Sequence, residues 1–202
     1  MDRKCPSDYV ETTNSSIETT KSFIGHFTHL TPSSKFSNLP PLVQPILTPR
    51  FALSCTPELL SSLGDLAASH DPPLPIQTHI SESPAEVKQA LELFPDCSTY
   101  AGVYEKFGLL KEGTILAHCI HLGDEEKEVI KRSGAGVSHC PSSNLHLNSG
   151  MARIREMLDM GMKVGLVFPP AFRLNSLILV PCVSLLSLPV RVPFISFFFH
   201  ID

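Results

Sequence analysis

Short apolar runs alternate along this chain with longer segments whose apolar residues recur at helical spacing. Each run is continuously apolar, which predicts a strand buried on both faces. We expect strands at residues 43–49, 75–80, 114–118, 135–139 and 162–166. We expect helices at residues 15–29, 56–69, 84–94 and 124–134, and from residue 151 to a stop at Gly161. Repeated strand–helix units of this kind require parallel strands joined by crossover helices.

Helix-start signals support two of these helices. Thr56 precedes Pro57, and Ser83 precedes Pro84, with Glu86 three residues after the serine. A threonine or serine at the N-cap accepts a backbone N–H, and proline is tolerated at the first helical position. A glutamate three residues after the cap completes a capping box. Helices are therefore expected to begin at both prolines.

Strand–helix units within 202 residues predict an α/β fold. A closed barrel of eight units typically needs about 250 residues, so we expect either an open α/β sheet or an incomplete barrel. After residue 166, proline-interrupted apolar runs replace the caps and helical periods. We therefore expect residues 1–166 to form the folded unit and residues 167–202 to be an aberrant tail that is not a native element. Residues 174–190 are too short for a membrane helix, which needs about 20 residues, and contain prolines.

Composition argues against several classes of protein. A hydrophobic fraction of 43% is that of a globular protein, and a formal charge of -4 without a basic stripe does not favour nucleic-acid binding. The six cysteines include no Cys-x-x-Cys pair, which argues against a disulfide framework and a thiolate zinc site. The first residues lack the apolar segment of a secretory signal, so a cytoplasmic location is expected.

Candidate catalytic groups lie at the predicted carboxyl ends of the strands. His79 is near the end of one strand, with Glu82 three residues later, and His118 and His139 end two others. This edge is where parallel βα folds gather ligand-binding and catalytic groups. Imidazole is the usual nitrogen ligand of Zn²⁺, so a metal ligand with a nearby proton carrier is one interpretation. A structural histidine is the alternative for any single one of them.

Arg50 and Phe51 follow the first predicted strand. A planar guanidinium beside an aromatic face suits a flat heteroaromatic ring that carries carbonyl and nitrogen acceptors. A surface cation next to a core phenylalanine explains the pair equally well.

Two further groups leave their roles open. His118 and His121 form a His-x-x-His pair, but side chains three apart on a strand point to opposite faces, so joint metal ligation is not expected. Ser142, Ser143 and Asn144 either line a pocket or form a capped turn before a helix.

Four motifs resemble the guanine deaminase family of the amidohydrolase superfamily. They are Thr48-Pro-Arg-Phe-Ala-Leu-Ser-Cys55, Gln77-Thr-His-Ile-Ser-Glu82, Leu116-Ala-His-Cys119 and His139-Cys-Pro-Ser-Ser-Asn-Leu145. The resemblance runs from about residue 1 to residue 166. It implies a partial (β/α)8 TIM barrel of the metal-dependent hydrolase type, which covers about strands 4 to 8 and does not close.

The resemblance also implies a role for each candidate residue. His79 would bind zinc and contact substrate, Glu82 would carry protons and contact substrate, and His118 would orient water and substrate. Arg50 and Phe51 would bind the purine. The implied reaction is hydrolysis of guanine to xanthine and ammonia, in which zinc lowers the pKa of its bound water and Glu82 passes a proton to the ring.

The resemblance has gaps as well. The family's first-strand His-x-His pair has no counterpart, and its eighth-strand aspartate is missing after Val164-Gly-Leu166, so only His79 of the zinc ligands is expected. Met1 is expected to be an internal position of a full-length homodimeric enzyme, and this chain is expected to be inactive alone. Two other functions stay open: a non-catalytic subunit that binds intact deaminase through exposed strand edges, and an amidohydrolase acting on another aminated ring or a chlorinated triazine.

Overall fold

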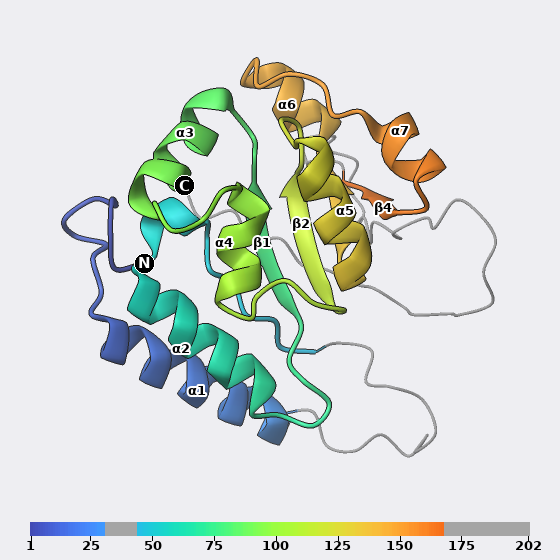
Figure 1. Cartoon of the computed structure of the whole chain (residues 1–202). Coiled ribbons are helices and arrows are strands. Elements are labelled where there is room, and N and C mark those ends of the chain that lie inside the picture. Colours follow the sequence, from blue (N-terminus) through green and yellow to red (C-terminus); the bar gives the residue numbers. More distant parts are fainter. Residues whose placement is uncertain (31–43, 168–202) are drawn as a thin grey trace, which may run out of the picture.

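A four-stranded parallel sheet forms the centre of the computed structural model, which describes residues 1–30 and 44–167. Its strands are β1 (Ile76–Ile80), β2 (Thr114–His118), β3 (Gly136–His139) and β4 (Lys163–Leu166), and they lie side by side in sequence order (Figure 1). This order is that of a segment of a (β/α) barrel, and the sheet does not close. The predicted fold class is therefore confirmed. The predictions for the tail beyond residue 167 lie outside the described residues.

Helices connect and cover the strands. They are α1 (Thr13–Leu30), η1 (Ala52–Ser54), α2 (Pro57–Ala68), α3 (Pro84–Leu93), α4 (Tyr100–Lys106), α5 (Asp124–Ser133), α6 (Pro141–His146) and α7 (Ile154–Asp159). Helix α1 packs alongside α2, α4 packs against α5, and α7 packs against β4 (Figure 1). Within the described part of the chain, no helix has both the length and the apolar character needed to cross a membrane.

Both predicted helix starts are confirmed by their hydrogen bonds. At α2, Thr56 Oγ1 accepts the N–H of Leu59 at 3.2 Å. At α3, Ser83 Oγ accepts the N–H of Glu86 at 3.2 Å. The Glu86 carboxylate accepts the N–H of Glu82 at 2.8 Å, one residue earlier than a regular capping box predicts. The cap of α3 therefore also fixes the backbone of the candidate proton carrier.

The prediction of a regular strand at residues 43–49 is wrong for the described residues 44–49. Among these described residues, only Leu47 forms a bridge, which is parallel to Ile76 of β1. The N–H of Leu47 donates to the carbonyl oxygen of Pro75 at 3.0 Å. Pro49 has no N–H with which to continue this ladder. The segment therefore runs beside β1 without becoming a full strand.

Two α-helices, and the short 3-10 helix η1, lie where the sequence predicted no helix. Helix α4 follows Thr99, whose Oγ1 accepts the N–H of Gly102 at 3.0 Å, and α6 lies between the strand expected at residues 135–139 and the helix expected from residue 151. Helix α7 begins at Ile154 rather than at residue 151. With 7, 6 and 6 residues, these helices contain fewer than two full turns, which is too little for a helical period to appear in the sequence.

Burial alternates along β1 and separates the core from the face that carries His79. Ile76, Thr78 and Ile80 are buried, whereas Gln77 and His79 are partly exposed. The largest fully buried side chains of the described residues include Tyr100, Tyr104, Leu60, Leu116 and Ile130. In a closed barrel the face opposite the helices is the interior, and His79 lies on this face near the carboxyl end of β1, the end at which barrel enzymes place their active sites.

Candidate active site

The imidazole of His79 is held by the backbone of Arg50, the residue before Phe51. Its Nδ1 lies 2.6 Å from the carbonyl oxygen of Arg50, which also accepts the His79 backbone N–H at 3.2 Å. A carbonyl oxygen only accepts, so Nδ1 carries the proton and Nε2 holds the lone pair. Burial lowers the pKa of His79, which keeps the ring neutral at pH 7. A neutral imidazole with one anchored nitrogen is the usual state of a metal ligand.

His118 stacks on His79, although the strand register places the two residues on opposite faces. Their ring centroids lie 5.3 Å apart with 23° between the planes. The register pairs His118 with Ile80, whose side chain faces the core, so regular alternation would send His118 the same way. The φ of His118 is 72°, a left-handed conformation that breaks the alternation. The N–H of Cys119 donates to the Ile80 carbonyl at 3.1 Å and holds this turn.

The side chains of Asn144 and Glu82 both approach the same ring nitrogen of His118. Its Nδ1 is 2.8 Å from Asn144 Oδ1 and 3.6 Å from Glu82 Oε1. Asn144 is buried, whereas the Glu82 side chain is 24% exposed and accepts a hydrogen bond from Ser149 Oγ at 3.4 Å. Glu82 therefore lies between the buried imidazole of His118 and the solvent-exposed side of the site. The sequence left the role of Asn144 open, and the structure shows it bonded to His118.

Arg50 and Phe51 lie at the same sheet edge as the histidines. The Arg50 guanidinium carbon is 5.5 Å from the centroid of the Phe51 ring. Arg50 is exposed and Phe51 is partly buried. Because the Arg50 carbonyl bonds His79, the segment that carries the cation and the ring is fastened directly to β1. The structure thus brings the predicted residues Arg50, Phe51, His79, Glu82 and His118 together.

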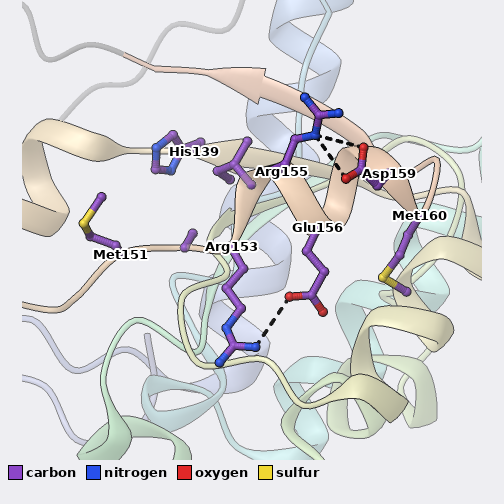
Figure 2. Close-up of a pocket in the computed structure, with 9 residues that line it drawn as sticks. His139, Met151, Arg153, Arg155, Glu156, Asp159 and Met160 are labelled. Carbon is purple, nitrogen blue, oxygen red and sulfur yellow. Dashed lines mark hydrogen bonds and ion pairs between the residues drawn. The ribbon is translucent and has the colours of Figure 1, made fainter.

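His139 ends the neighbouring strand β3 and lies close enough to His118 for their positive charges to repel each other. It lines a pocket with residues 151–153, helix α7 and Met160, and Figure 2 shows its ring on the same side of the pocket as Met151. Two ion pairs lie among the lining residues, Arg155 with Asp159 at 3.0 Å and Arg153 with Glu156 at 3.6 Å (Figure 2). Burial lowers the pKa of His139. None of the residues that meet at the β1–β2 edge lines this pocket.

The described residues fit zinc at one position only. Among residues 1–30 and 44–167, no group of three or more histidine, cysteine, aspartate or glutamate side chains is arranged to hold a metal ion. His79 can serve as one zinc ligand, because its Nδ1 is anchored and its Nε2 carries the lone pair. His121 directs its Nε2 to the Ser149 carbonyl at 2.8 Å. Since a zinc site needs at least about three protein ligands, these residues do not complete one by themselves.

The parallel βα sheet, with His79, Glu82 and His118 at its carboxyl edge, is that of a partial barrel of the hydrolase type. The model of the amidohydrolase family matches residues 10–182, most of the chain. The chain belongs to the amidohydrolase family.

Within that family the chain is similar to guanine deaminases, as its motifs predicted. It is 47% identical over 167 residues to a protein of Schizosaccharomyces pombe named "probable guanine deaminase", covering 82% of this chain and 30% of that protein. A solved guanine deaminase from C. acetobutylicum with bound guanine is 38% identical, with a TM-score of 0.72, and the match covers 82% of this chain and 37% of that one. A zinc complex of atrazine chlorohydrolase from Arthrobacter aurescens is 25% identical, with a TM-score of 0.68, covering 81% and 34%. The chain spans about a third of the length of these proteins.

Proposed function

We propose that this chain supplies part of the active site of an enzyme that hydrolyses guanine to xanthine and ammonia. The observation that carries the proposal is that His79, Glu82 and His118 meet at one edge of the sheet. The ring centroids of His79 and His118 are 5.3 Å apart, and His118 Nδ1 is 3.6 Å from Glu82 Oε1. The substrate is supported by the similarity to a guanine deaminase that was solved with guanine bound.

Glu82 moves the protons in this proposal. Its carboxylate is partly exposed, so it reaches both a water molecule and a purine bound over the sheet edge. It accepts a proton from the water that attacks the ring carbon bearing the amino group. It returns this proton to the ring nitrogen, then accepts the proton of the hydroxyl group left on that carbon and donates it to the amino group, which leaves as ammonia as the carbonyl forms. His118, held by Asn144 at 2.8 Å, stays fixed beside Glu82 and orients the reacting groups.

Arg50 and Phe51 bind the purine. The exposed guanidinium donates to the purine carbonyl oxygen through a charge-assisted hydrogen bond, and the Phe51 ring offers an aromatic face for the flat bicycle. The anchoring of the Arg50 carbonyl to His79 sets the purine-binding pair against the proton carrier.

Zinc enters the proposal through His79. When bound, Zn²⁺ supplies a coordinated water of lowered pKa. His79 Nε2 provides one ligand, and the described residues do not complete the set, so we expect this chain alone to bind zinc weakly and to be inactive. For the whole protein we propose a homodimer in the cytoplasm that acts on free guanine and binds neither nucleic acid nor membrane. The formal charge of -4 supports the absence of a nucleic-acid partner.

A chimera tests the proposal directly. The segment of the C. acetobutylicum guanine deaminase that matches this chain is replaced by the matching residues of this chain, and ammonia release from guanine and bound zinc are measured. We expect guanine turnover by the chimera and none by the isolated chain. Glu82→Gln should lower turnover by about 100-fold or more while zinc stays bound. Glu92→Gln, an exposed glutamate of α3, is the matched control.

Two outcomes contradict the proposal. Normal turnover by the Glu82→Gln chimera would remove the proton-carrying role of Glu82. If a folded, zinc-loaded chimera hydrolyses a different aminated or chlorinated ring in preference to guanine, guanine is not the substrate.

A further inference from the structure

The hydroxyl of Tyr104 in α4 is bonded to both segments that carry the candidate site. It accepts the N–H of Ala52 at 3.0 Å and the hydroxyl of Thr78 at 3.0 Å, and it donates to the carbonyl oxygen of His79 at 2.7 Å. A phenol has one proton and two lone pairs, so these bonds use its full capacity.

Burial keeps this arrangement intact over a wide pH range. Tyr104 is 0% exposed, and burial raises the pKa of its phenol far above the usual value. The hydroxyl therefore stays protonated and keeps its bond to the His79 carbonyl at any pH near neutrality. Ala52 is also 0% exposed, so its N–H is cut off from water and depends on this acceptor.

The bond at Ala52 acts on the candidate site through two residues of backbone. The Arg50 carbonyl, two residues before Ala52, accepts both the Nδ1–H and the backbone N–H of His79, at 2.6 and 3.2 Å. Thr78 Oγ1 also approaches that carbonyl at 3.4 Å. Tyr104 holds Ala52 on one side and the His79 carbonyl on the other, so it sets the spacing across which the Arg50–His79 bond forms.

We propose that Tyr104 is a positioning residue, whose hydroxyl keeps residues 50–52 in register with β1 and thereby selects the His79 tautomer with a proton on Nδ1. What the positioned groups then do rests on the proposed function. The positioning itself is a property of this chain and is measured without substrate or metal.

Tyr100 provides a matched control one helical turn away. It is also 0% exposed, and its ring stacks on Tyr104 with centroids 5.5 Å apart. Its hydroxyl donates to Glu86 Oε1 at 2.9 Å and lies 3.4 Å from the Tyr104 hydroxyl. It bonds neither to residues 50–52 nor to residues 78–79. Tyr100→Phe and Tyr104→Phe therefore remove the same atom from the same buried helix face.

The test is ¹⁵N NMR of the histidine rings in the full chain at mildly alkaline pH, where imidazoles are neutral. We expect wild-type His79 to show one tautomer with the proton on Nδ1. In Tyr104→Phe, the two ring-nitrogen signals should move toward each other and the Nδ1 proton should exchange with water about tenfold faster or more. Tyr100→Phe should keep the wild-type His79 signals, although both variants lower the Tm. Wild-type His79 signals in a folded Tyr104→Phe variant would overturn the proposal.

A wild-type measurement keeps the proposal falsifiable if Tyr104→Phe does not fold. The Ala52 amide should resist hydrogen exchange as strongly as the Gln77 amide of β1, which donates to the Leu47 carbonyl at 2.9 Å. Exchange of Ala52 as fast as an unbonded loop amide would show that the Tyr104 bond does not form. Neither experiment involves guanine, so a failed turnover test and a failed positioning test remain distinguishable.

Discussion

Removing the Asp2 carboxylate should loosen the segment that follows the candidate purine-binding pair. Asp2 Oδ1 accepts the N–H of Thr56 at 2.8 Å, and Oδ2 accepts the hydroxyls of Thr56 and Thr13, each at 2.7 Å. The Asp2 N–H also donates to the Ser54 carbonyl at 3.2 Å. Asp2 thus ties η1 and the start of α2 to α1. The change Asp2→Ala removes every bond made by the carboxylate and keeps the backbone bond.

The expected loss follows from these contacts. A hydrogen bond to a charged group contributes about 1.5–3 kcal/mol when it is well buried. Asp2 is partly exposed, and the threonine hydroxyls of Thr13 and Thr56 turn to water when it is gone, so we discount the sum to about 2 kcal/mol. For a chain of this size, about 2 kcal/mol lowers the Tm by about 4–8 °C.

The effect should depend on pH in a defined direction. Burial alone would raise the pKa of Asp2, but the hydrogen bonds from Thr56 and Thr13 outweigh it and hold the pKa below its ordinary value. A carboxyl with a depressed folded-state pKa stabilises the fold fully above its unfolded pKa of about 3.9. This stabilisation is lost as the pH falls through the folded-state value. The difference between wild type and Asp2→Ala should therefore be larger at pH 7 than at pH 3.

Thermal unfolding followed by circular dichroism at both pH values measures this difference. Asp8→Ala, in the exposed part of the same segment, is the matched control and should shift the Tm little. Equal Tm values for Asp2→Ala and Asp8→Ala at pH 7 would contradict this prediction. The prediction also fails if the gap to wild type is as large at pH 3 as at pH 7.

Two further predictions concern the elements that support the site. Gly64→Ala should destabilise by about 3 kcal/mol or prevent folding, because an added Cβ would lie 2.0 Å from the carbonyl oxygen of Phe107, and backbone cannot move aside cheaply. Gly25→Ala, in open space on α1, should instead raise the Tm slightly; equal effects in denaturant unfolding would contradict the packing argument. Ser83→Ala should cost about 1 kcal/mol through loss of the α3 cap, whereas Ser83→Thr should keep most of it, and identical urea midpoints for the two variants would show that the cap bond to Glu86 contributes nothing.

Local chemistry made much of the fold predictable. Apolar runs located the strands of the sheet, and the Thr56 and Ser83 caps located two helix starts, because both signals depend on neighbours in sequence. Pro49 stopped the first run from becoming a full strand, since a missing N–H outweighs apolar character at a ladder position. Short helices such as α4 were missed because fewer than two turns leave no readable period.

The sequence by itself determined which groups stand at the strand ends, because the residues at the close of each apolar run are fixed once the strands are. It therefore placed His79, Glu82 and His118 at one edge of a parallel sheet. Only the tertiary structure decided how they meet. Strand alternation would separate His118 from His79, and the left-handed φ of 72° at His118 brings the rings together. The bonds of Tyr104 to Ala52 and His79 join residues far apart in sequence, and no local pattern contains them.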